Sequence, residues 1–120
     1  MEGSLWVELV GNIIMARIRG VPTEVLLRGC QDRVLALLKD TSVRNVLYDG
    51  LELESPTVEI TLMQQHLSEQ MHELGVRVAC VVANTRIAYL SRLAFGSGEH
   101  RIFYNDMGAA IRWLESGQPS

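Results

Sequence analysis

The chain has 120 residues, the length of one ordinary domain. Hydrophobic residues make up 48% of it and charged residues 21%, which excludes disordered and fibrous proteins. Its formal net charge of −3 argues against a module that binds nucleic acid by neutralising phosphates.

The sequence also indicates where the protein works. The longest unbroken apolar run, residues 78–83, is too short to span a membrane. Glu2 and Glu8 interrupt the start of the chain, so we expect no secretory signal. Cys30 and Cys80 lie far apart and follow no metal-ligand spacing, which is typical of reduced thiols. We therefore expect a cytoplasmic protein.

Two short strands are predicted first, over residues 5–10 and 13–20, with a Gly-Asn turn pair between them. In the second run apolar residues alternate with arginines and a methionine, which is the period of a half-solvated strand. This pattern predicts a β-hairpin.

Helices and strands then alternate. Apolar residues recur every three or four positions over residues 23–39, which predicts an amphipathic helix, and residues 45–50 are typical of a strand. A second helix is expected to begin with Ser55 as N-cap and Pro56 in its first turn, and to end at Gly75. Its predicted apolar face consists of Leu62, Met63, Leu67, Met71 and Leu74.

The last part of the chain continues this alternation. Residues 76–82 form a nearly continuous apolar run, typical of a central parallel strand, and residues 101–104 predict a last strand. Helices are predicted over residues 86–95, after an Asn-Thr cap, and through residues 113–114, after an Asn-Asp cap. A Gly-Ser-Gly stretch at 96–98 ends the third helix, and residues 117–120 are expected to be a frayed tail.

The predicted order is β-β-α-β-α-β-α-β-α. Alternating strands and helices require right-handed crossovers and a mainly parallel sheet. We therefore predict that residues 1–120 form a single α/β domain with about five strands and about four helices.

The sequence carries no metal or cofactor motif. His66 and His72 are six residues apart on one predicted helix and do not share a face, and His100 lies in a loop. No dinucleotide-binding, Walker or serine-hydrolase motif is present. We expect no bound metal and no cofactor.

Asp49 is the first candidate for a functional residue. It ends a predicted parallel strand, where open α/β sheets place their ligand crevices. Glu52, Glu54 and Glu59 follow, and such carboxylates can hold a cation or act as a general base. A solvated surface loop is the more frequent role of such a run, so catalysis is the weaker hypothesis.

Ser55 and Thr57 are hydroxyl residues at the predicted start of the second helix. A phosphate there would be stabilised by the helix dipole, so both are candidates for phosphorylation, and simple helix capping is the alternative. Asp49, Ser55, Thr57 and Glu59 together form the predicted binding or switch site.

Two further groups suggest ligands. Arg86, Arg92 and Arg101 can form a cationic patch for an anionic small ligand or a protein partner, or be solvated surface. Met63 and Met71 can line an adaptable apolar pocket, although ordinary core packing is the more frequent role at their positions.

The element order resembles that of the SpoIIAA-like fold, which anti-sigma-factor antagonists share with the STAS domains of sulfate transporters. It is more similar to the small bacterial SpoIIAA-like proteins of the STAS/SEC14 type. The resemblance spans nearly the whole chain and rests mainly on core patterns. The similar stretches are residues 16–20, 46–49, 77–81, 101–103 and 110–114.

The resemblance implies a non-catalytic regulatory or protein-interaction module. In the antagonists, a serine of an Asp-Ser-Ser-Gly sequence at the start of the second helix is phosphorylated and releases an anti-sigma kinase. The corresponding residues here, 53–59, lack that sequence, and Ser55 and Thr57 lie roughly in its place. The implied partner is a protein, with a homodimer possible. The SEC14-type name implies the alternative, a carrier or sensor of a small apolar or anionic ligand.

Overall fold

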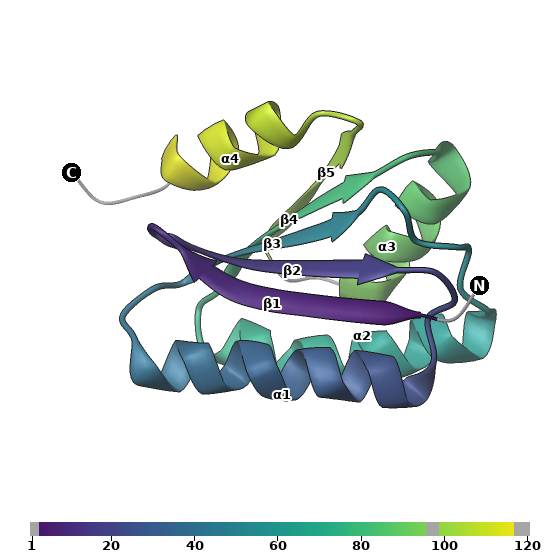
Figure 1. Ribbon diagram of the computed structural model, residues 1–120, viewed down its shortest axis with the longest axis horizontal. Helices are drawn as coiled ribbons and strands as arrows, with labels where there is room; N and C mark the ends of the chain where they lie inside the picture. The colour runs from purple at the N-terminus through teal and green to yellow at the C-terminus, as the bar shows by residue number, and fades with distance from the viewer. Residues whose placement is uncertain (1–2, 96–98, 117–120) are drawn as a thin grey trace.

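The computed structural model describes residues 3–95 and 99–116 (Figure 1). The stretches predicted as a glycine-rich turn and a frayed tail lie outside these residues. Strands and helices follow one another in the order β1 (Ser4–Val10), β2 (Ile13–Arg19), α1 (Glu24–Asp40), β3 (Asn45–Gly50), α2 (Val58–Glu73), β4 (Arg77–Val82), α3 (Thr85–Phe95), β5 (His100–Tyr104) and α4 (Met107–Ser116).

The strands form one five-stranded sheet in the order β1-β2-β3-β4-β5. β1 and β2 pair antiparallel through a two-residue turn, in which Gly11 has a φ of 59°, and the other neighbours are parallel. A positive φ at the first turn residue suits a hairpin turn and favours glycine. The predicted mainly parallel α/β sheet is confirmed.

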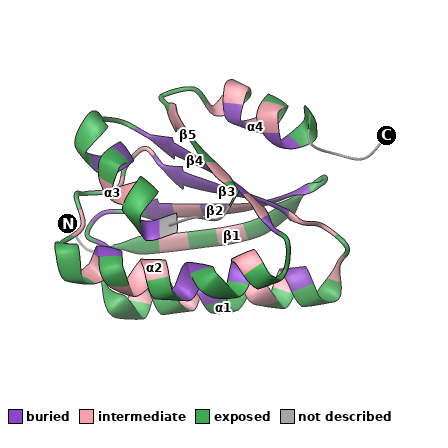
Figure 2. Cartoon of the chain, turned by 180° about the vertical axis from the view of Figure 1, so that it is seen from behind, coloured by how far each residue is buried: buried purple, intermediate pink, exposed green. Residues whose placement is uncertain are grey.

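Helices cover the two faces of the sheet unequally. Figure 2 shows α1 and α2 along one face, with α3 beside α2, and α4 alone on the other face. Alternate residues of β3 serve the two cores: Val46 and Tyr48 pack against α1 and α2, whereas Leu47 packs against Leu114 of α4. β3 and β4 are buried on both faces, which explains why the sequence of β4 is nearly continuously apolar after Arg77.

The start of α2 differs from the prediction. Thr57, not Ser55, is the N-cap: its hydroxyl accepts a hydrogen bond from the amide of Ile60 at 3.2 Å. Backbone hydrogen bonds hold the chain along the end of β2 as far as Glu54, so it turns into the helix only after Pro56. The predicted cap was wrong because this tertiary contact delays the turn.

The predicted apolar face of α2 was partly wrong. Leu67 and Met71 are buried, but Leu62 and Leu74 are exposed. Thr61 and Ser68 are buried instead, since each donates its hydroxyl to a backbone carbonyl of the preceding helical turn. The buried face of α2 therefore includes two polar residues that the predicted apolar face did not contain.

Arg77, the first residue of β4, links this strand to Glu99, which precedes β5, and to α4. Its Nε donates to Oε1 of Glu99 at 2.9 Å, and Nη1 donates to the Trp113 carbonyl at 3.1 Å. The guanidinium also lies 4.0 Å from the centroid of the Trp113 ring. Because it caps carbonyls in the last turns of α4, this side chain fastens α4 to β4.

Arg77→Ala is expected to lower the free energy of unfolding by about 2–3 kcal/mol, because buried carbonyls lose a charged donor and the indole loses its cation. Urea unfolding measures the change. The control, Arg86→Ala, alters an exposed arginine of α3 and should change stability by less than about 0.5 kcal/mol. Equal effects of the two substitutions would contradict the clamp.

Candidate functional site

The loop between β3 and α2 lies at the carboxyl ends of the parallel strands. The amide of Gly20 donates to the Glu52 carbonyl at 3.0 Å, and the amide of Glu54 donates to the Gly20 carbonyl at 2.9 Å. Gly20 has a φ of 79°, a conformation that favours glycine. These bonds extend the pairing of β2 into the loop and hold it beside the sheet.

The Asp49 side chain holds the start of this loop through hydrogen bonds. Its Oδ2 accepts from Nε of Arg17 at 2.9 Å, and its Oδ1 accepts from the amide of Leu51 at 3.2 Å. The Asp49 carboxylate is nearly buried, and a charge in that position is stable only with such partners. In this structure Asp49 is a positioning residue of the loop.

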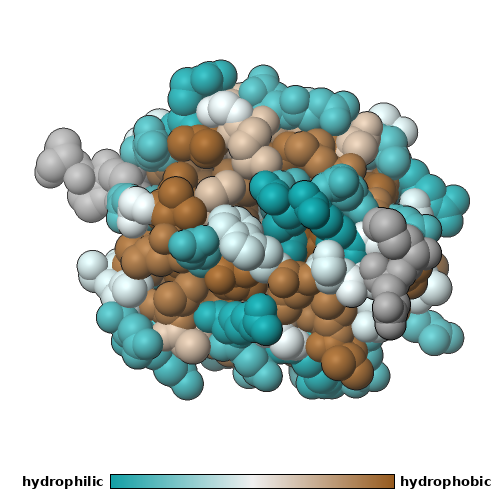
Figure 3. All heavy atoms as spheres, in the orientation of Figure 1, coloured by the Kyte–Doolittle hydropathy of each residue, from teal (hydrophilic) through white to brown (hydrophobic). Residues whose placement is uncertain are grey.

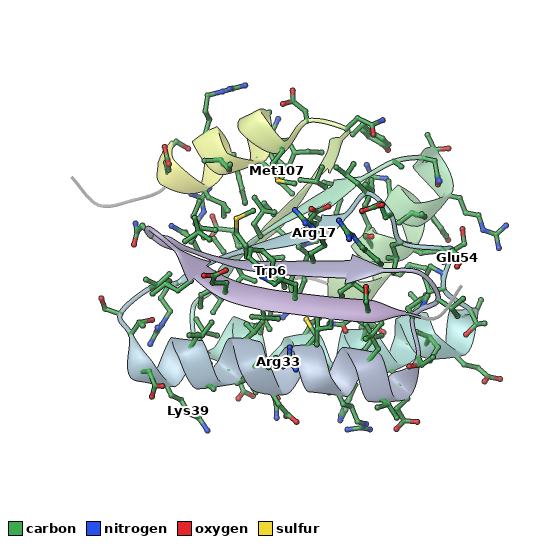
Figure 4. The ribbon with its side chains drawn as sticks, viewed as in Figure 1. Trp6, Arg17, Arg33, Lys39, Glu54 and Met107 are labelled. Atoms are coloured by element: carbon green, nitrogen blue, oxygen red, sulfur yellow. The ribbon has the colours of Figure 1, made fainter. Side chains whose placement is uncertain are left out.

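The Asp49 carboxylate lies on the face of the sheet that carries α4. It alternates with Tyr48, which packs toward α1 and α2. Figure 4 shows Arg17 and Trp6 on the same side of the sheet as Met107 of α4, with the guanidinium of Arg17 5.5 Å from the Trp6 ring centroid. The ion pair of Asp49 and Arg17 therefore borders the part of this face that α4 does not cover.

The other predicted site residues lie elsewhere. Ser55, Thr57 and Glu59 are exposed at the start of α2, which covers the opposite face of the sheet. Ser55 precedes the N-cap by two residues. The structure therefore brings Ser55, Thr57 and Glu59 together but separates them from the Asp49 carboxylate.

The acidic loop does not gather its carboxylates around a cation. Glu52 pairs with Nε of Arg19 at 2.6 Å, as Asp49 pairs with Arg17. Among residues 3–95 and 99–116, no group of three or more His, Cys, Asp or Glu side chains can hold a metal ion. Each of the two arginines of β2 thus neutralises one carboxylate.

The predicted cationic patch is divided by the sheet. Arg86 and Arg92 are on α3, whereas Arg101 lies over the ring of Phe103, which faces α4. The two methionines belong to the core: Met71 is buried and accepts from the Tyr48 hydroxyl at 3.4 Å, and the partly buried Met63 packs against the same core cluster. Neither feature forms a ligand site.

The thiols are buried beside Tyr48. Burial raises the pKa of Cys30 to about 12, and it also raises the pKa of Cys80. The pKa of Tyr48 is raised as well, first by burial and then by the two cysteines. Because the thiolate is the reactive form, both cysteines are protonated and unreactive at neutral pH.

A cavity of about 80 Å³ lies between α2 and α3 at the carboxyl ends of β3 and β4. Its walls are mainly apolar, with side chains such as Leu53, Ile60, Ile87, Leu90 and Ala94. Sequence reasoning missed it, since a cavity depends on how two helices pack. Sequence reasoning also missed the partner of Asp49, although a parallel pairing of β2 and β3 places Arg17 opposite it.

No known family model matches the chain, and no curated protein matches it. Solved structures do. A protein of the DUF3478 family with a SpoIIAA-like fold from Shewanella loihica shares 19% identity, with 93% of each chain covered and a TM-score of 0.67. An anti-sigma factor antagonist from Mycobacterium paratuberculosis shares 13%, with 95% of each chain covered and a TM-score of 0.70.

A third similar structure is the anti-sigma factor antagonist SpoIIAA in its unphosphorylated form, at 9% identity and a TM-score of 0.66, with 97% of this chain and 100% of that chain covered. The chain therefore has a SpoIIAA-like, STAS-like fold, and the predicted resemblance is confirmed at the level of fold. Among the described residues, no helix has the length and apolar character needed to cross a membrane.

Arg17→Met is expected to lower the free energy of unfolding by about 2–3 kcal/mol, because it leaves the buried carboxylate of Asp49 without its cation. Urea unfolding measures this, and faster hydrogen exchange at the Leu51 amide would report the loosened loop. The control is Arg28→Met, which removes an exposed pair with Glu24 and should cost less than about 0.5 kcal/mol. An Arg17→Met protein as stable as this control would contradict the positioning role.

Proposed function

We propose that this protein is a non-catalytic regulatory module of the cytoplasm that binds a protein partner through the start of α2. The binding surface comprises Ser55, Thr57, Val58, Glu59 and Leu62, and we call it the α2 surface. The observation that carries the proposal is the exposure of two large apolar residues beside these polar ones.

Val58 and Leu62 are 67% and 55% exposed. They are four residues apart, so they lie on one face of α2 over its first two turns. Exposed apolar residues rimmed by polar ones are typical of protein interaction sites. On this surface Glu59 and the two hydroxyl residues supply the polar rim.

The hydroxyl groups suggest how binding is regulated. The Thr57 side chain caps α2, so a phosphate on it would lie at the positive end of the helix dipole. Ser55 is exposed two residues earlier and is the second candidate. A charged phosphate beside Val58 would disfavour contact with an apolar surface of the partner. Phosphorylation at either position is therefore proposed to release the partner.

The comparisons support this class of function. Two of the similar structures are anti-sigma factor antagonists, and one of them is described in its unphosphorylated form. The positioning role of Asp49 fits the same proposal, because a loop fastened to β2 holds the start of α2 in one place.

Leu62→Asp is expected to reduce partner recovery at least tenfold, because it places a charge at the centre of the apolar pair. Tagged protein is incubated with an extract of the cells that make it, and retained proteins are quantified by mass spectrometry. Leu74→Asp is the control, since it makes the same change at the exposed far end of α2. Thr57→Asp tests the switch in the same assay and should also lower recovery.

The result that contradicts the proposal is equal recovery by wild type, Leu62→Asp and Leu74→Asp. An extract that yields no protein enriched over a bait-free resin contradicts it too. Circular dichroism of each variant confirms that the fold is retained.

A second candidate function is the binding of a small apolar ligand in the cavity between α2 and α3. Its apolar walls favour a ligand without charge, and apolar cavities of roughly twice this volume bind molecules of the size of benzene. The anionic ligand of the alternative prediction finds no cationic side chain among the lining residues. A short hydrocarbon chain is the class that fits a cavity of this volume.

Native mass spectrometry of gently isolated protein is expected to show an added mass if the cavity is a carrier site. Ala94→Val reduces the free volume and should lower the bound fraction severalfold, while Ala36→Val on exposed α1 serves as the control. A bare mass in every preparation would rule out the carrier function and leave the regulatory proposal intact.

A further inference from the structure

β1 is an edge strand of the sheet that residues 3–95 and 99–116 form, since β2 is its one neighbour among these described residues. The two-residue hairpin determines which amides and carbonyls of β1 form hydrogen bonds with β2. Val10 and Ile13 close the turn and exchange hydrogen bonds, so Trp6 and Glu8, at every second position, also face β2. The amides and carbonyls of Leu5, Val7 and Leu9 therefore point outward.

This edge lacks the features by which proteins prevent strands from pairing. Its seven residues include no proline and no lysine, and Glu8 is its one charged residue. The opposite edge differs: β5 has five residues, and two of them are His100 and Arg101. Apolar side chains are also exposed along β1, including Leu9 and Val10.

Figure 3 shows apolar residues gathered over the part of the surface where β1 and β2 run. Trp6 is 39% exposed there, between Glu8 on its own strand and Arg17 on β2. Beside it, Ser4, Leu5, Trp6, Arg17 and Arg19 line a hollow of about 190 Å³. This edge thus combines open hydrogen-bonding groups with exposed apolar surface.

We propose that β1 is a homodimer interface, in which two copies of the chain pair their β1 strands antiparallel about a two-fold axis at Val7. The strand Ser4–Val10 is centred on Val7, so this register pairs its whole length with itself. Leu5 lies opposite Leu9 of the second copy, and Val7 lies opposite Val7. These are the three residues whose backbone groups point outward, so every one of those groups finds a partner.

The side chains on both faces suit this register. On the α1 face, Leu5, Val7 and Leu9 meet their apolar counterparts. On the other face, Trp6 lies opposite Glu8 of the second copy, so a carboxylate arrives beside the indole over which the Arg17 guanidinium already lies. Val10 of the second copy lies opposite Ser4, at the hollow beside Trp6. Cross-strand pairs of these kinds stabilise sheets.

The dimer is independent of the proposed partner site. The α2 surface belongs to a helix that packs against core residues of β3 and β4 and lies behind α1 in Figure 1, and α1 is the helix that packs against β1. Pairing through β1 leaves both copies of that surface open. A dimer would therefore present two partner sites, and either function can fail without the other.

Sedimentation equilibrium of the purified protein is expected to show a monomer–dimer equilibrium. Glu8→Lys should raise the dimer dissociation constant at least tenfold, because it places two lysines near Arg17 in place of two attractive pairs. The control Glu73→Lys makes the same charge change at an exposed position on α2 and should leave the constant within about twofold. Val7→Pro removes an outward donor that β2 does not use, and it should also weaken the dimer.

Cysteine cross-linking tests the register. Ser4→Cys and Val10→Cys proteins, mixed in equal amounts under mild oxidation, should form disulfide dimers in at least fivefold higher yield than either variant alone. The single variants are the register controls, because Ser4 meets Ser4, and Val10 meets Val10, only in registers other than the proposed one. The native thiols do not interfere, since Cys30 and Cys80 are buried.

A protein that remains monomeric up to about 1 mM overturns the proposal. So does a dimer that is weakened equally by Glu8→Lys and Glu73→Lys, because it would use another face. Equal cross-linking yields from the mixture and from either single variant overturn the register. The thermal unfolding midpoint of each variant, measured at a dilution where wild type is monomeric, separates loss of pairing from loss of fold.

Discussion

Strands β3 and β4 are buried on both faces, and the rest of the structure is arranged to cover them. Tyr48 and Leu47, adjacent in β3, belong to cores on opposite sides of the sheet. In the part of the chain that the structure describes, three helices cover one side, whereas the ten-residue α4 covers only part of the other. The remainder of that face, over β1 and β2, is therefore left to side chains such as Trp6 and Arg17.

This unequal cover explains why polar groups lie where they do. Asp49 ends a buried strand at the border of the uncovered area, where Arg17 can reach it from β2 and still contact water. The same ion pair holds the first residue of the loop that leads to α2. The ion pair that neutralises the buried Asp49 carboxylate thus also positions the start of α2, where a partner is proposed to bind.

Much of the fold followed from local pattern, and the candidate site followed only in part. Periodicity located each strand and helix because burial on one or two faces leaves a direct trace in residue order. Asp49 was correctly placed at the end of a parallel strand, but nothing in its neighbourhood in the sequence names Arg17, 32 residues away, as its partner. The cap of α2 was misplaced by two residues because backbone bonds to Gly20 delay the turn.

The sequence by itself determined the fold class, the hairpin, the order of elements and the absence of familiar cofactor motifs, since these depend on short-range patterns of polarity and turn chemistry. Only the tertiary structure decided which side of the sheet each candidate residue faces. It separated the Asp49 carboxylate from Ser55 and Thr57. It also left Leu62, a member of the predicted apolar face of α2, exposed beside Val58, and left the β1 edge of the described sheet open. Those outcomes depend on how elements distant in the chain pack together, and a linear pattern of residues does not record that packing.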